Sequence, residues 1–236
     1  RIERLHNIIM VAQSGVLLSL TFILAYESAE LTTSVSFPWI ILNADDVEFR
    51  VKCRSFKFIM IIFLLSKLYE QVDTIILILR GKSLLMLHVW HHGTTFMATY
   101  CAMFTAAIFW FGFINSFIHI LMYLYYARFN WIKPFAKYIT KLQILQFCVG
   151  LFLGARSFLY PKKGIRVSFS GSGSEKEDHD VDVASCSALL IFITLSYLTL
   201  FLCFFARKYT QQRGSERTSS RTGSIFSLLS IPISWE

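Results

Sequence analysis

The sequence predicts an all-α, polytopic membrane helix bundle. The chain of 236 residues is 55% hydrophobic and only 16% charged, and its mean hydropathy is +0.53. Ordinary soluble domains carry about 25% charged residues, so this balance favours a membrane protein. Apolar stretches recur along the whole chain, and the alternation of polar and apolar residues that a membrane barrel needs is missing from the sequence.

Six apolar stretches predict six membrane spans, because a spanning helix needs about 20 mainly apolar residues. The predicted membrane domain is 1–210, and the polar stretch that begins at 211 predicts a disordered tail, 211–236. The expected spans are about 8–26, 56–79, 84–105, 106–129, 135–160 and 186–207.

Charge asymmetry orients the predicted bundle. With six spans both termini lie on one side, and that side carries most of the basic residues and few of the acidic ones. The positive-inside rule makes this side cytosolic. The net charge of +8 therefore reports orientation and attraction for an anionic substrate. It does not indicate nucleic acid, because the sequence has no basic stripe interleaved with aromatic residues.

Ionisable residues inside two of the predicted spans indicate a site within the membrane. Each costs roughly 2.5–3.5 kcal/mol to insert, so such residues usually face an interior cavity. The charged group, in the earlier of these two spans, could be an ion-pair network whose only role is to fix the packing of the helix. Three histidines on one face of the next span are harder to explain by packing alone. The groups are Lys67, Glu70 and Asp73, spaced i, i+3, i+6, and His88, His91 and His92, spaced i, i+3, i+4.

Two further polar stripes follow on the next predicted helices. The stripe on the earlier helix could be aromatic side chains that only pack, with one hydrogen-bonded histidine among them. The stripe on the later helix could be amide side chains that form hydrogen bonds to a neighbouring helix. The stripes are Asn115, His119, Met122, Tyr123 and Tyr126, and then Thr140, Gln143 and Gln146.

Together the four motifs resemble the ELO family of very-long-chain fatty acid elongases. The family boxes KxxExxDT, LHxxHH, NxxxHxxMYxYY and TxxQxxQF match KLYEQVDT, LHVWHH, NSFIHILMYLYY and TKLQILQF, in the family's order. The resemblance covers roughly 56–160. Gln71 stands where the family often has Phe, and the C-terminus lacks a dilysine-type retrieval signal. The family fold has seven spans, so we expect that its first span is missing from this sequence.

The resemblance implies a condensing enzyme of fatty acid elongation, a 3-oxoacyl-CoA synthase. It would join long-chain acyl-CoA to malonyl-CoA and release 3-oxoacyl-CoA, CoA and CO₂, with the acyl chain in a tunnel of the bundle. We expect a multi-pass protein of the endoplasmic reticulum membrane with a cytosolic C-terminus. Membrane lipid, the reductases and dehydratase of the elongation cycle and a second copy of the chain are expected partners. No cofactor and no metal are expected.

The chemistry of the reaction assigns roles to the motif residues. Neutral imidazole is a competent acyl acceptor and a good leaving group, so His91 is the expected nucleophile. His119 is a second reactive imidazole, while His88, His92 and Asn115 position groups and donate hydrogen bonds to developing oxyanions. Basic loop residues could bind the CoA phosphates, although orientation alone would also place them there. The expected substrate-binding residues are Lys67, Glu70, Asp73, Tyr123, Tyr126, Gln143, Gln146, Arg80, Lys82, Lys133 and Lys137.

Three alternatives remain open at the level of sequence. Histidine boxes also hold iron in membrane desaturases and hydroxylases, and a single metal on His88, His91, His92 and His119 is conceivable. A lipid-binding or lipid-transporting protein could line a permeation path with the same polar stripes. The chain could also be an inactive, truncated relative of the elongases.

Overall fold

The computed structural model describes residues 2–31, 55–82, 84–105, 107–160, 166–167, 179–180 and 182–210. These residues confirm the all-α prediction, apart from two short paired strands in which Arg166 lies opposite Asp180. The predicted tail, 211–236, lies outside the described residues. The elements are α1 (Ile2–Leu31), α4 (Phe56–Tyr69), α5 (Gln71–Leu79), α6 (Met86–Ala102), α7 (Ala107–Tyr126), η1 (Asn130–Phe135), α8 (Ala136–Leu159), β1 (Arg166–Val167), β2 (His179–Asp180), α9 (Val183–Phe205) and η2 (Ala206–Thr210).

Within the described residues, three helical stretches are long and apolar enough to cross a membrane. They are Ile2–Leu24, Asn130–Leu159 and Val183–Tyr209. The other three predicted spans are also helical, and a short turn separates α6 from α7. The last span begins at Val183, earlier than predicted, because the Asp182 side chain accepts a hydrogen bond from the Ala184 N–H and so caps the helix.

The predicted span 56–79 is divided into two helices, contrary to expectation. Glu70 separates α4 from α5. The Asp73 N–H donates to the Glu70 carbonyl over 3.2 Å, which is a 3₁₀-type bond that tightens the chain there. The polar residues of the first motif therefore lie at a break between two helices rather than along one continuous helix.

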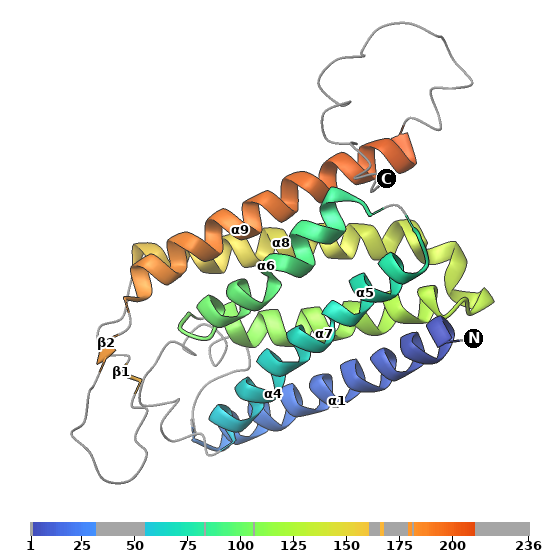
Figure 1. Ribbon diagram of the computed structural model, residues 1–236. Coiled ribbons are helices and arrows are strands. Elements are labelled where there is room, and N and C mark those ends of the chain that lie inside the picture. The colour runs from blue at the N-terminus through green and yellow to red at the C-terminus, as the bar shows by residue number, and fades with distance from the viewer. Residues whose placement is uncertain are drawn as a thin grey trace, which may run out of the picture.

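The six helical regions form a closed ring of neighbours. Around the ring α1 packs on α7, α7 on α8, α8 on α9, α9 on α6, α6 on α4, and α4 on α1. Figure 1 shows the N-terminus and the end of α9 at one end of the bundle, and β1 and β2 at the other. Both ends of the described chain thus lie on one side, as an even number of spans requires.

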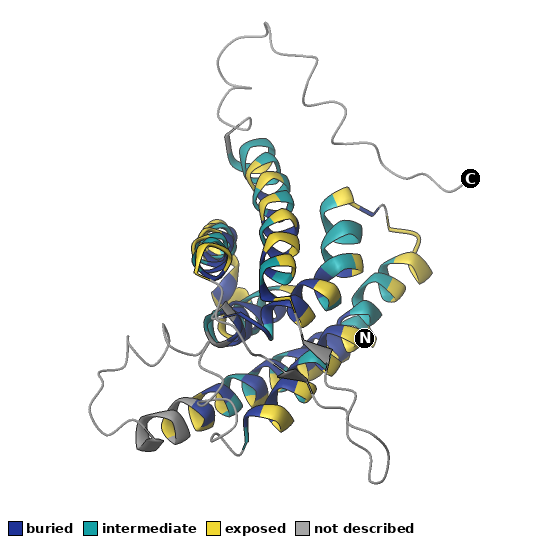
Figure 2. Cartoon of the chain, turned by 90° about the vertical axis from the view of Figure 1, so that its left-hand side faces the viewer, coloured by how far each residue is buried: buried dark blue, intermediate teal, exposed yellow. Residues whose placement is uncertain are grey.

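Apolar side chains cover the outside of the ring as well as its core. Figure 2 shows buried and exposed residues side by side on the same helices. The exposed ones include Phe58, Phe152 and Phe192, each more than 60% exposed, while Phe63 and Tyr197 are buried in the core. Hydrocarbon rather than water suits such outer faces, so this pattern agrees with a bundle in lipid.

Two glycines let α8 and α9 approach closely. Gly150 and Gly154 lie four residues apart on α8, in the G-x-x-x-G arrangement that membrane helices use for close packing. A Cβ atom on Gly154 would lie 3.1 Å from the side chain of Ile191, and one on Gly150 would lie 3.4 Å from that of Thr194. This close contact holds together α8 and α9, both of which contribute residues to the site described next.

Candidate active site

A cavity of about 180 Å³ lies between α6, α7, α8 and the end of α9 with η2. Three of the four sequence motifs supply its lining, although they are far apart along the chain. The structure therefore gathers half of the predicted site residues, including all five expected catalytic ones, around one space inside the bundle. Those that line it are His88, His91, His92, Asn115, His119, Tyr126, Gln143 and Gln146.

The first motif lies behind the cavity and holds the residues that line it. Lys67 is fully buried, and its Nζ donates to Glu70 Oε1 over 2.7 Å and to Asn115 Oδ1 over 2.6 Å. His119 Nδ1 lies 3.4 Å from Glu70 Oε1, and its Nε2 lies 3.1 Å from the Asn115 amide nitrogen. A neutral His119 with its proton on Nδ1 satisfies both contacts. The ion-pair network thus contacts two side chains of the cavity, Asn115 and His119, and orients them.

Asp73 and Tyr123 do not line the cavity but bond to each other beside it. The Tyr123 hydroxyl donates to Asp73 Oδ2 over 2.6 Å, and His6 Nε2 lies 2.6 Å from Asp73 Oδ1. Sequence reasoning missed His6, which lies outside every motif. A signal was present, because the buried polar residues Asn7, Ser14 and Thr21 recur every seven positions and mark the inward face of α1.

The histidines of α6 form a compact group. The rings of His88 and His92 stack with their centroids 4.2 Å apart, and His91 lies edge-on to His92 at 5.4 Å. Two residues in the first turn of α5 form hydrogen bonds with this group as well. Thr74 Oγ1 lies 3.1 Å from His88 Nε2, and the Gln71 amide donates to the His92 carbonyl.

The His91 ring lies against an aromatic wall. Its centroid is 4.9 Å from that of Tyr197 and 6.4 Å from those of Phe147 and Phe201. The hydroxyls of Thr95 and Tyr197 donate to the His91 backbone carbonyl and hold the helix there. Within the described residues no hydrogen bond is made by a ring nitrogen of His91, so its lone-pair nitrogen is not engaged by another protein group at the cavity.

The four basic residues predicted to bind CoA do not line this cavity. Arg80 forms an ion pair with Glu3, and Lys82 is exposed. Lys133 Nζ donates to Asn130 Oδ1 over 2.8 Å and lines a separate surface hollow. Lys137 Nζ lies 5.9 Å from the centroid of the Phe205 ring.

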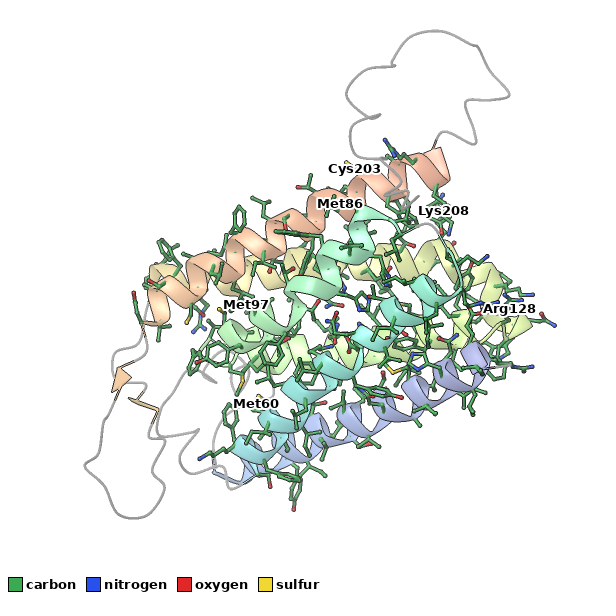
Figure 3. The ribbon with its side chains drawn as sticks, viewed as in Figure 1. Met60, Met86, Met97, Arg128, Cys203 and Lys208 are labelled. Atoms are coloured by element: carbon green, nitrogen blue, oxygen red, sulfur yellow. The ribbon has the colours of Figure 1, made fainter. Side chains whose placement is uncertain are left out.

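A different lysine reaches the cavity. Lys208 of η2 lines it together with Tyr209, Phe201 and Phe204. Figure 3 shows Lys208 and Arg128 at the same end of the bundle, where α1 begins and α9 ends. The positive-inside pattern marked this region as basic but could not distinguish the residues that face the cavity from those that only orient the bundle.

The positions of the described histidines bear on the metal alternative. In the described ranges no group of three or more His, Cys, Asp and Glu residues is arranged to hold a metal ion. His119 is engaged through both ring nitrogens, and His88 is bonded to Thr74. In this arrangement the rings of His88 and His119 make hydrogen bonds to neighbouring side chains.

The family model of ELO, the GNS1/SUR4 family, matches residues 1–217. The chain belongs to the ELO family. It is 36% identical over 165 residues to fatty acid elongase A of Dictyostelium discoideum, across 67% of this chain and 57% of that protein.

Shorter matches join the chain to other ELO relatives. It is 45% identical over 94 residues to fatty acid elongase sre1 of Dictyostelium discoideum, across 38% of this chain and 35% of that protein. It is 43% identical over 101 residues to fatty acid elongase 1 of Trypanosoma cruzi, across 39% of this chain and 35% of that protein. The matched part spans from 35% to 57% of the length of these relatives. No solved structure matches the chain.

Proposed function

We propose that this chain is a condensing enzyme of fatty acid elongation. It joins a long-chain acyl-CoA to malonyl-CoA and gives 3-oxoacyl-CoA, CoA and CO₂. The observation that carries the proposal is the cavity in which the α6 histidines meet Asn115 and His119 of α7. Membership of the ELO family and the names of its relatives support elongation as the setting.

The first half-reaction transfers the acyl group to His91. A ring nitrogen attacks the thioester carbonyl, the C–S bond breaks, and CoA leaves as a thiolate that takes the proton lost by the imidazole. An acyl-imidazole results, which splits one difficult step into two easier ones. The contacts of the His91 ring support this assignment, because the ring lies against aromatic side chains and its lone pair is not engaged by another described protein group.

The second half-reaction forms the new C–C bond. Malonyl-CoA loses CO₂, and the electron pair of the broken bond forms a thioester enolate. The enolate attacks the acyl carbonyl, and the imidazole leaves and recovers a proton from the solvent. Asn115 uses one amide hydrogen on His119 and keeps the other for an oxyanion in the cavity. Decarboxylation supplies the carbanion equivalent, so the proposal includes neither a metal nor a cofactor.

The two ends of the acyl-CoA would occupy opposite ends of the site. Lys208 lies in η2, at the end of the bundle where α1 begins, and can bind CoA phosphates. At the other end Gln146 lines both the main cavity and a small apolar cavity between α7 and α8, which Trp110, Ile114 and Leu153 complete. An acyl tunnel in this direction would gain about 0.8 kcal/mol for each buried methylene.

The proposed cellular setting follows from the reaction. We place the protein in the endoplasmic reticulum membrane with a cytosolic C-terminus, where acyl-CoA and malonyl-CoA are available. The reductases and the dehydratase that complete an elongation cycle would consume its product. A homodimer is a further proposed assembly.

An elongation assay tests the proposal directly. The protein in microsomes or proteoliposomes receives a panel of acyl-CoAs with malonyl-CoA labelled either at C2 or at the free carboxyl. We expect C2 label in 3-oxoacyl-CoA and carboxyl label in CO₂, and neither with His91→Ala. Folded wild-type protein that binds acyl-CoA without forming labelled product would favour the lipid-binding alternative instead.

A further inference from the structure

A histidine outside every motif bonds to the first motif. His6 of α1 is buried, and its Nε2 lies 2.6 Å from Asp73 Oδ1. The other oxygen of Asp73 accepts from the Tyr123 hydroxyl over 2.6 Å, so the carboxylate is held from both sides. Buried hydrogen bonds of carboxylates are short and strong, and losing one partner leaves a costly unpaired group.

This bond belongs to a polar seam between α1 and α5. Glu3 and His6 lie three residues apart on one face of α1. Glu3 contacts Arg80, the residue that follows α5, and His6 contacts Asp73 in the first turn of α5. None of the residues of α5 is buried. The apolar residues of this short helix are half-buried at most, so its polar contacts also contribute to its position.

The polar seam is connected to the cavity by Thr74, the residue next to Asp73 in the chain. Thr74 follows Asp73, and its Oγ1 lies 3.1 Å from Nε2 of His88, which lines the cavity. The His88 ring in turn stacks on His92 at 4.2 Å. If Asp73 moves, Thr74 moves with it, and the orientation of His88 is released.

We infer that His6 is a positioning residue of the active site, which fixes His88 through Asp73 and Thr74. The inference rests on the proposed condensation and adds to it a role for α1, which carries none of the four motifs. His6 does not touch the cavity, so its contribution is the placement of other groups. It follows that loss of the bond should slow the chemical steps more than it weakens substrate binding.

Three variants separate the bond from simple packing. His6→Phe keeps a ring of similar size and removes the bond to Asp73, whereas His6→Gln keeps an N–H donor. Met10→Leu is the matched control, because Met10 is an apolar side chain that is also buried, one turn further along α1. We expect His6→Phe to lower kcat by roughly tenfold with little change in either KM, and His6→Gln and Met10→Leu to stay within about threefold of wild type.

A double variant tests the route through Asp73. If His6 acts through this carboxylate, His6→Phe combined with Asp73→Asn is no slower than Asp73→Asn alone, because residues in one network are not additive. Independent, multiplying losses would overturn the inference. Wild-type kcat in His6→Phe, or an equal loss in His6→Gln, would overturn it as well.

A chemical readout tests the inference without activity. Diethyl pyrocarbonate modifies accessible, unbonded imidazoles, and mass spectrometry locates the modified histidine. We expect His88 to react several times faster in His6→Phe than in wild type, His6→Gln or Met10→Leu. An unchanged His88 rate in His6→Phe would contradict the inference. If the wild-type protein forms no 3-oxoacyl-CoA, the proposed function fails, and the labelling of His88 still decides the role of His6.

Discussion

At the scale of single residues, the clearest feature is a fully buried lysine with two oxygen partners. Sequence spacing predicts the pair of Lys67 with Glu70, because residues three apart share a helix face. It does not predict the bond from Lys67 to Asn115, which is 48 positions away. That contact depends on how α4, α6 and α7 pack, and no local pattern carries this information.

Removing the lysine should expose the cost of the buried charge. In Lys67→Met the Glu70 carboxylate loses its main partner, and breaking a buried pair in this way costs roughly 3–5 kcal/mol. We expect a clear fall in Tm in detergent and partial recovery in Lys67→Met combined with Glu70→Gln. Lys57→Met, an exposed lysine on the same helix, is the control. A Tm of Lys67→Met equal to that of wild type, or a double variant below the single one, would contradict the network.

At the scale of elements, α5 and α7 end with the same backbone turn. Gly81 has φ of 61° and Arg128 has φ of 64°. The N–H of the following residue bonds back five positions in each case, from Lys82 to Leu77 over 3.1 Å and from Phe129 to Leu124 over 3.4 Å. These are Schellman caps, in which glycine is the favoured residue. Gly81 is therefore recognisable in sequence as a helix end, whereas Arg128 is not.

The two caps should respond to substitution in opposite directions. Arg128→Gly removes the steric cost of a left-handed side-chain residue and should raise stability by about 1 kcal/mol. Gly81→Ala introduces the same cost and should lower stability by a similar amount, about 1 kcal/mol, since nothing else lies within 4 Å of the added Cβ. Thermal unfolding in detergent measures both. Shifts of the same sign would show that side-chain contacts, and not backbone strain, decide these positions.

The remaining elements show what an apolar pattern can and cannot predict. Composition and span length predict the helical bundle, because hydrocarbon permits few other structures. The break at Glu70 was not predicted, since it depends on a local 3₁₀ bond within a stretch that reads as one span. The start of α9 was misplaced because the cap of Asp182 lies in a polar stretch that reads as a loop.

At the scale of the whole molecule, six helices close a ring and bring three motifs to one cavity. The sequence identifies most of the polar residues involved, because their periodicity marks the inward faces. It does not distinguish those that line the cavity from those behind it. Asp73 and Tyr123 were expected at the substrate and lie beside the cavity, while Lys208 was not expected and lines it.

The central claim is that His91 accepts the acyl group, and a single-turnover experiment tests it most directly. Purified protein is incubated with acyl-CoA alone, and free CoA and the mass of each histidine peptide are measured. The account predicts one CoA released per active site, an acyl adduct on His91, transfer of that adduct to product when malonyl-CoA is added, and neither release nor adduct in His91→Ala. An active enzyme that forms its adduct on another residue, or that retains turnover in His91→Ala, would contradict it.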